Sequence, residues 1–177
     1  PPEGSAATPL IVTLHGDGQA ASVVHGAWQK AALRRGIGVL SLQCPKALGC
    51  NGSYWQWDGA PSWIEARVNE VDAFRTVDRS RLWLVGWSGG ASYLGYRSQD
   101  LASAFAAFVV HGGGMPPKVA NCSEAKPPVY FLVGSGNPLH GLAVQLKEHY
   151  ETCGHAIEWS LVKGADHSGE WNALPSR

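Results

Sequence analysis

The 177-residue chain is 45% hydrophobic and 16% charged, and its 14 basic residues balance its 14 acidic ones. Nucleic acids and anionic membranes favour a basic face, so this balance argues against both kinds of partner. No apolar run approaches the roughly 20 residues of a membrane-spanning helix. The length suits one domain, 1–177, and because the start, PPEGSAATPL, has no signal-peptide pattern, we expect a mature or trimmed form.

Strand-like and helix-like segments alternate along the chain. A strand-like segment opens the chain, a helix-like one follows at 22–36, and a loop rich in Gly, Trp and Cys occupies 44–60. The strands are expected at 10–16, 37–43, 81–87, 106–111, 128–134 and 156–162.

A further helix is expected to begin at Pro61, because proline is favoured in the first helical turn. Apolar residues then recur near the helical period, at Ile64, Val68, Val71 and Phe74. This spacing is typical of an amphipathic helix.

Three of the expected strands are nearly continuous apolar runs without polar alternation. Such runs are typical of strands buried on both faces, as in a parallel sheet covered by helices, and the alternation of strands and helices agrees. The sequence therefore predicts an α/β fold with about six mostly parallel strands flanked by helices. Ligands bind beyond the carboxyl ends of the strands in such sheets, so the turns that end the strands are the places to search for a site.

The segment GWSGG contains the pattern G-x-S-x-G at Gly86, Ser88 and Gly90. An apolar strand precedes it and a helical pattern follows it. A serine in that context sits on a tight strand–turn–helix elbow, whose crowded backbone needs small flanking residues. Ser88 is the candidate nucleophile. The alternative is that this Gly-rich turn has only a structural role and that Ser88 is not catalytic.

The segment LHGDG ends the first strand and is a candidate for one half of an oxyanion hole. Such a hole needs two backbone N–H groups aimed at one point. We expect one from Gly89, directly after the candidate nucleophile, and the other from Asp17. A carboxylate pointing inward would repel the charge to be stabilised, so we expect the Asp17 side chain to point away and brace the loop.

The segment GADHSGEW follows the last strand and contains His167, which a Gly-bounded loop can bring to the elbow serine. Seven histidines are present, so each alone is a weak candidate. His15 is expected to be structural, His111 is the second candidate base, and His140 is expected to start a helix.

Together, LHGDG, VDRSRLWLVGWSGG and GADHSGEW resemble the α/β-hydrolase superfamily in motif and chain order. More narrowly, they resemble secreted feruloyl and acetylxylan esterases and poly(3-hydroxybutyrate) depolymerases. The resemblance implies a minimal α/β-hydrolase fold without a lid, and a serine esterase with no metal and no organic cofactor. Ser88 would attack the ester carbonyl and His167 would transfer the proton. Short-chain or aryl esters, free or polymer-linked, are the expected substrates.

The superfamily usually carries its triad acid after the strand before the last, and Asn137 in GSGNP holds that position. Asn accepts a hydrogen bond but supplies no negative charge. Three interpretations stay open: a weakened triad with Asn137, a catalytically weak or inactive module that binds glycan or phenolic ligands, or a replacement carboxylate. The candidates for the replacement are Asp166, Glu158, Glu170 and Asp58.

Aromatic side chains gather around the expected site. Tyr54, Trp55, Trp57 and Trp63 lie in or beside the loop 44–60, Trp87 precedes Ser88, and Trp171 follows His167. Trp55, Trp57, Trp87 and Trp171 are candidate substrate-binding residues that stack on sugar or phenolic rings. Alternatively the rings cover the core, in which case they should be buried.

Four cysteines permit two disulfides. The segment CPKALGC suggests a Cys44–Cys50 bridge, which leaves Cys122 with Cys153, whereas four free thiols in a cytosolic protein are the alternative. No spacing typical of a metal site occurs. We expect both bridges, a secreted or periplasmic location, and a monomer.

Overall fold

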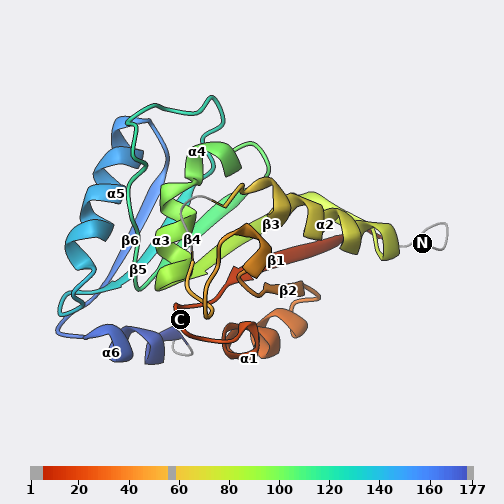
Figure 1. Ribbon diagram of the computed structural model, residues 1–177, viewed down its shortest axis with the longest axis horizontal. Coiled ribbons are helices and arrows are strands. Elements are labelled where there is room, and N and C mark those ends of the chain that lie inside the picture. Colours follow the sequence, from red (N-terminus) through yellow and green to blue (C-terminus); the bar gives the residue numbers. More distant parts are fainter. Residues whose placement is uncertain (1–5, 56–58, 175–177) are drawn as a thin grey trace.

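A parallel β-sheet forms the centre of the molecule (Figure 1). The computed structural model describes residues 6–55 and 59–174. Within these residues the sheet has six strands in the order β2-β1-β3-β4-β5-β6, and every neighbouring pair is parallel. The strands are β1 Thr8–Leu14, β2 Gly38–Leu42, β3 Val77–Trp87, β4 Ala107–His111, β5 Val129–Gly134 and β6 Ile157–Val162. All six expected strands are confirmed.

Apolar side chains leave both faces of the sheet, which explains the continuous apolar runs. On β1, Leu10, Val12 and Leu14 enter the larger core cluster, whereas Ile11 enters a smaller one with Val85 and Ala32. Successive strand residues point to opposite faces, so a strand covered on both sides needs apolar residues throughout.

Helices cover the two faces unequally (Figure 1). Residues of α2 (Ser62–Phe74), α3 (Gly89–Tyr96) and α5 (His140–Thr152) build the larger cluster, with α4 (Ser98–Leu101) beside them. The opposite face carries α1 (Ala21–Leu33) and α6 (His167–Asn172). A short 3₁₀ helix, η1 (Lys46–Leu48), lies in the loop after β2. No helix among 6–55 and 59–174 is long and apolar enough to cross a membrane.

Two sequence-based boundaries need correction. Strand β3 begins at Val77, four residues before the expected start at 81, because Val77 pairs with Thr8 across a register irregularity. Within this stretch the backbone N–H and the hydroxyl of Ser80 donate hydrogen bonds to the carboxylate of Asp78. Such local bonds are typical of turns, which is why the sequence did not indicate a strand here. On α2, Ile64 and Val68 are buried as expected, but Phe74 is 85% exposed because it ends the helix.

Both expected disulfides are present, Cys44–Cys50 and Cys122–Cys153. Cys44 and Cys50 belong to the larger core cluster, in the loop after β2. Cys122 and Cys153 connect the segment before β5 to the end of α5.

Candidate active site

Ser88 lies at a sharp elbow between β3 and α3. Its backbone has φ 52° and ψ −114°, a conformation that a non-glycine residue adopts only when the surrounding structure imposes it. The flanking glycines are required by space: a Cβ on Gly86 would lie 2.5 Å from Ala91 Cα, and one on Gly90 would lie 2.5 Å from Leu14 O. The G-x-S-x-G pattern thus has the structural context that the sequence predicted.

His167 is the first residue of α6, and its ring reaches the elbow from the loop after β6. His167 Nε2 lies 2.9 Å from Ser88 Oγ. The imidazole stacks on the indole of Trp87, with ring centroids 4.6 Å apart and an angle of 10° between the planes. Trp87 therefore fixes the plane of the ring that faces the serine.

The carboxylate that faces His167 belongs to Glu170. Glu170 Oε1 lies 2.8 Å from His167 Nδ1, and the side chain is fully buried. Asn137 Nδ2 donates to the same oxygen, and the N–H of Gly134 donates to Oε2. Two glycines leave room for the carboxylate, since a Cβ on Gly112 would lie 2.6 Å from Oε1 and one on Gly134 would lie 3.1 Å from Oε2. A buried carboxylate held by this set of donors stays paired although water is excluded.

Asn137 lies where the superfamily places its acid, but its amide serves Glu170. Its Oδ1 accepts from the N–H of Leu139 at 2.8 Å, which fixes the orientation of the amide. Nδ2 then faces two acceptors, Gly112 O at 3.2 Å and Glu170 Oε1. These acceptors use both protons of Nδ2, so the 3.1 Å separation from His167 Nδ1 is a close approach rather than the bond of a triad acid. Asn137 is therefore within reach of the imidazole, as expected, but not as an acceptor.

The other candidate carboxylates lie elsewhere. Asp166 caps α6, with Oδ1 accepting from the N–H of Gly169 at 2.7 Å. Glu158 is exposed on β6. Asp58, like Trp57, lies outside the described residues. The spacing of His167 and Glu170, three residues apart on one helix, is the sequence signal that could have identified Glu170 as the partner of His167, because such residues share a face.

The turn after β1 brings Asp17 beside the elbow. Among the described residues, the backbone N–H groups of Asp17 and Gly89 donate no hydrogen bond. The Asp17 carboxylate accepts from the N–H of Trp55 at 2.9 Å, so it braces the neighbouring loop as expected. It also lies against Gly89, where a Cβ would be 2.2 Å from Oδ1, so the expectation that this side chain points away from the elbow is wrong.

The side chains of the other three histidines that the sequence singled out, His15, His111 and His140, make no hydrogen bond to Ser88 in this structure. His15 is buried, its Nδ1 lies 2.7 Å from Gly16 O, and burial lowers its pKa. His111 is also buried; its Nε2 lies 3.0 Å from Glu170 O, and burial lowers its pKa to about 4. His140 starts α5, as expected.

Trp55 is structural cover, which corrects its assignment as a substrate-binding residue. It is 4% exposed. Its ring packs against Trp63 and Tyr93, and its Nε1 donates to His15 O at 2.7 Å. Tyr54, by contrast, is 55% exposed.

The ring of Trp87 is also not free to stack on a substrate ring, because it is 4% exposed and its face is covered by the imidazole of His167. Trp171 is half-buried and packs against Trp87 with ring centroids 4.7 Å apart. Both indoles border a cleft of about 330 Å³ that contains Ser88 and His167. The other residues that line this cleft are Gly16, Asp17, Gln19, Val23, Ser168 and Asn172.

Solved esterase structures resemble the chain, although no family profile and no curated protein sequence matches it. Esterase PE8 is 20% identical over 97% of this chain and 92% of its own, with a TM-score of 0.74. SOBER1 from Arabidopsis thaliana is 15% identical over 96% of this chain and 95% of its own, with a TM-score of 0.70. The carboxylesterase of Bacillus cereus is 16% identical over 96% and 87%, with a TM-score of 0.69. The chain has the α/β-hydrolase fold, whereas the narrower resemblance to feruloyl esterases and depolymerases stays a prediction.

Proposed function

We propose that this protein is a serine carboxylic ester hydrolase in which Ser88, His167 and Glu170 form the catalytic triad. The observation that carries the proposal is a continuous series of contacts, from Ser88 Oγ to His167 Nε2 at 2.9 Å and from His167 Nδ1 to Glu170 Oε1 at 2.8 Å. A nucleophile, a base and a group that orients the base within hydrogen-bond distance are the signature of an activated serine. The esterase names of the structural neighbours agree with this chemistry.

In the acylation step, Ser88 Oγ forms a bond to the ester carbonyl carbon while His167 Nε2 takes the hydroxyl proton. The negative charge that develops on the carbonyl oxygen is held by the N–H groups of Gly89 and Asp17. The tetrahedral intermediate then expels the alcohol, which receives the proton from Nε2. Water attacks the acyl-enzyme by the same route and releases the carboxylic acid and Ser88.

In the ordinary triad one aspartate both occupies the position of Asn137 and supplies the negative charge. Here Glu170 supplies the charge, and Asn137 occupies the position. Glu170 accepts the Nδ1 proton of His167 and supplies the negative charge that stabilises the imidazolium. Asn137 is a positioning residue, because it reaches the imidazole only through the carboxylate it holds. The binding-module alternative depended on the lack of a charged partner for His167, so the Glu170 contact favours the enzyme over the module.

Short-chain or aryl esters are the substrates that the cleft suits. Its volume of about 330 Å³ is close to the lower end of ligand pockets, roughly 300–1,000 Å³. A series of p-nitrophenyl esters tests this point. Activity should be greatest for short acyl chains, and activity that rises through C12 would identify a lipase-like site instead.

A fluorophosphonate probe tests the proposed nucleophile without knowledge of the substrate. It should label Ser88 in the wild-type protein and in an exposed-serine control, Ser22→Ala, but not in Ser88→Ala. Turnover of p-nitrophenyl acetate should follow the same pattern. Absence of labelling and turnover in the folded wild-type protein would overturn the proposed function.

The two disulfides fit an oxidising compartment, so we place the protein outside the cytosol, secreted or periplasmic. We also propose that it acts as a monomer on free or polymer-linked esters.

A further inference from the structure

The turn that carries Asp17 has few contacts of its own. Gln19 N donates to Gly16 O at 3.0 Å, and Gly16 N donates to Gln19 Oε1 at 3.2 Å. Because the N–H of Asp17 must point at the substrate oxygen, other segments of the chain have to fix its direction.

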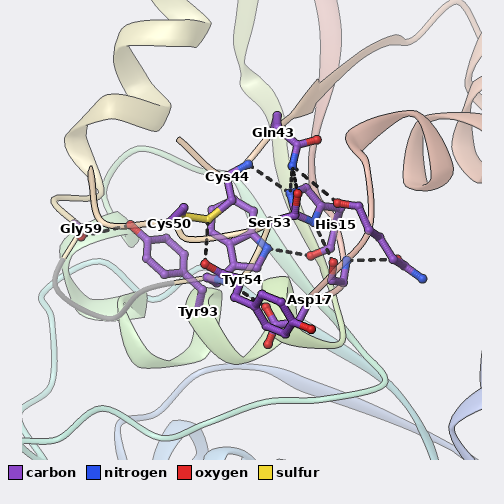
Figure 2. The surroundings of a disulfide bond; sticks show 12 residues. His15, Asp17, Gln43, Cys44, Cys50, Ser53, Tyr54, Gly59 and Tyr93 are labelled. Atoms are coloured by element: carbon purple, nitrogen blue, oxygen red, sulfur yellow. Dashed lines mark hydrogen bonds between the residues drawn. A yellow bond between two sulfur atoms is a disulfide. The ribbon is translucent and has the colours of Figure 1, made fainter. Parts of the chain in front are cut away.

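The segment that follows β2 supplies the fixing contacts (Figure 2). Gly18 N donates to Ser53 O at 3.1 Å, and Trp55 N donates to Asp17 Oδ1 at 2.9 Å. The indole of Trp55 donates from Nε1 to His15 O at 2.7 Å. Hydrogen bonds from this segment therefore reach both ends of the turn and the side chain between them.

The ring of His15 connects the same two segments. Its Nε2 accepts from the N–H of Cys44 at 3.0 Å, so Nδ1 carries the proton and donates to Gly16 O at 2.7 Å. Burial lowers the pKa of His15 and favours the neutral ring that this pattern requires. Gln43 Nε2 lies 2.9 Å from His15 Nε2 and 3.0 Å from Ser53 Oγ, which joins the ring to the loop once more.

The Cys44–Cys50 bridge closes the first part of this loop, directly before Ser53 and Trp55 (Figure 2). The described part of the loop has little regular structure, namely η1 and a single bridge between Asn51 and Tyr54. The disulfide is buried, and the nearby Trp55 ring packs on Tyr93 with centroids 5.0 Å apart. The disulfide and the buried Trp55 ring thus anchor this segment to the core at two points.

From this arrangement we propose that the loop 44–55, which the Cys44–Cys50 bridge anchors, positions the oxyanion hole, and that Trp55 is its positioning residue. The inference rests on the proposed esterase function. The loop directs the N–H of Asp17, and it also holds the Asp17 carboxylate through the N–H of Trp55. Release of the loop has two consequences. The donor loses its direction, and the Asp17 carboxylate, which already lies against Gly89, loses the N–H of Trp55 that holds it and becomes free to accept from the N–H of Gly89. Both consequences weaken stabilisation of the transition state rather than binding of the substrate.

The chain contains a matched control, because its second disulfide, Cys122–Cys153, lies away from the cleft residues. We would compare Cys44→Ser/Cys50→Ser with Cys122→Ser/Cys153→Ser, at a temperature where circular dichroism shows both folded. Loss of one oxyanion donor costs about 10²–10³ in kcat, so a misdirected donor should cost about tenfold or more. The first variant should show this loss with little change in KM, and the control should keep the wild-type kcat.

Trp55→Phe provides a second test if the first variant does not fold. It keeps an aromatic ring in the core, although a smaller one, and removes the Nε1–H donor to His15 O, which then accepts only from the N–H of Gly90. We therefore expect kcat to fall with little change in KM. A wild-type kcat in a folded disulfide variant, or in Trp55→Phe, would overturn the inference. In either case, labelling of Ser88 and turnover by the wild-type protein would leave the proposed function standing.

Discussion

Glu170 Oε1 lies 2.8 Å from His167 Nδ1, and the two residues belong to one turn of α6. The proposed acid and the proposed base thus lie on the same short helix, while Asn137 holds the position where the sequence predicted the acid. Asp166 caps this helix through the N–H of Gly169, so one local structure orients both side chains.

Replacement of Glu170 by Gln should strongly reduce turnover. The change keeps the shape but removes the charge that stabilises the imidazolium, and the equivalent change in a serine protease triad lowers kcat by about 10⁴. We expect a loss of about 10²–10⁴ in kcat for p-nitrophenyl acetate, with little change in KM. Glu158→Gln, on the exposed side of β6, is the control and should be wild-type in activity. Equal activity of the two variants would show that Glu170 is not the acid.

Replacement of Asn137 by Asp should lower activity, although it restores the residue usual at that position. Asn137 Nδ2 donates to Glu170 Oε1 and Gly112 O, so a carboxylate would place oxygen against two acceptors. Two carboxylates in one buried site cannot both stay ionised. We expect a loss of about tenfold or more in kcat, from the unsatisfied acceptors and the altered charge.

The double variant Asn137→Asp/Glu170→Gln tests whether the negative charge can act from position 137 instead of position 170. It returns the acid to the usual position and leaves an amide at 170, so its kcat should exceed that of Glu170→Gln alone. A gain of activity in Asn137→Asp alone would contradict the assignment, because Asn137 would then be a weakened acid.

The two disulfides should differ in their effects on stability and on activity. A bridge stabilises chiefly by restricting the unfolded chain, more for longer loops. The bridges span sequence separations of 31 for Cys122–Cys153 and 6 for Cys44–Cys50. The loop-entropy relation then predicts losses of about 4 and about 2 kcal/mol in the free energy of unfolding. Urea unfolding should therefore rank Cys122→Ser/Cys153→Ser as the less stable variant, opposite to the order expected for kcat.

Acid should destabilise the protein through His111. Burial lowers the pKa of His111 to about 4 in the folded protein, against about 6.5 in an unfolded chain. Below about pH 6.5 the unfolded state binds the proton more readily, so the free energy of unfolding falls as the pH drops toward about 4. The loss from this group is about 3 kcal/mol at most.

Urea unfolding at several pH values between 7 and 4 measures this loss. His111→Gln keeps a donor for Glu170 O but does not titrate, so its stability should depend less on pH over this range. Parallel curves for the wild-type and variant proteins would contradict the assignment.

The sequence by itself determined the parallel sheet, the elbow at Ser88 and the histidine loop. Continuous apolar runs report burial on both faces of a sheet, and a glycine on each side of Ser88 reports a crowded backbone. These are local signals, carried by residues adjacent in the chain. The cysteine spacing predicted both disulfides for the same reason. Cys44 and Cys50 are close in the chain, and once they are paired only Cys122 and Cys153 are left.

Only the tertiary structure decided which carboxylate faces the base and which tryptophans are buried. Glu170 is placed by the path of α6 and by two donors from the end of β5 and the turn after it, Gly134 and Asn137. The space it fills exists because Gly112 has no side chain. Trp55 is covered by Tyr93, which is distant in sequence. The spacing of His167 and Glu170 allows the two side chains to meet, but the burial of Glu170 and of Trp55 depends on segments that come together only after folding, so no run of neighbouring residues records it.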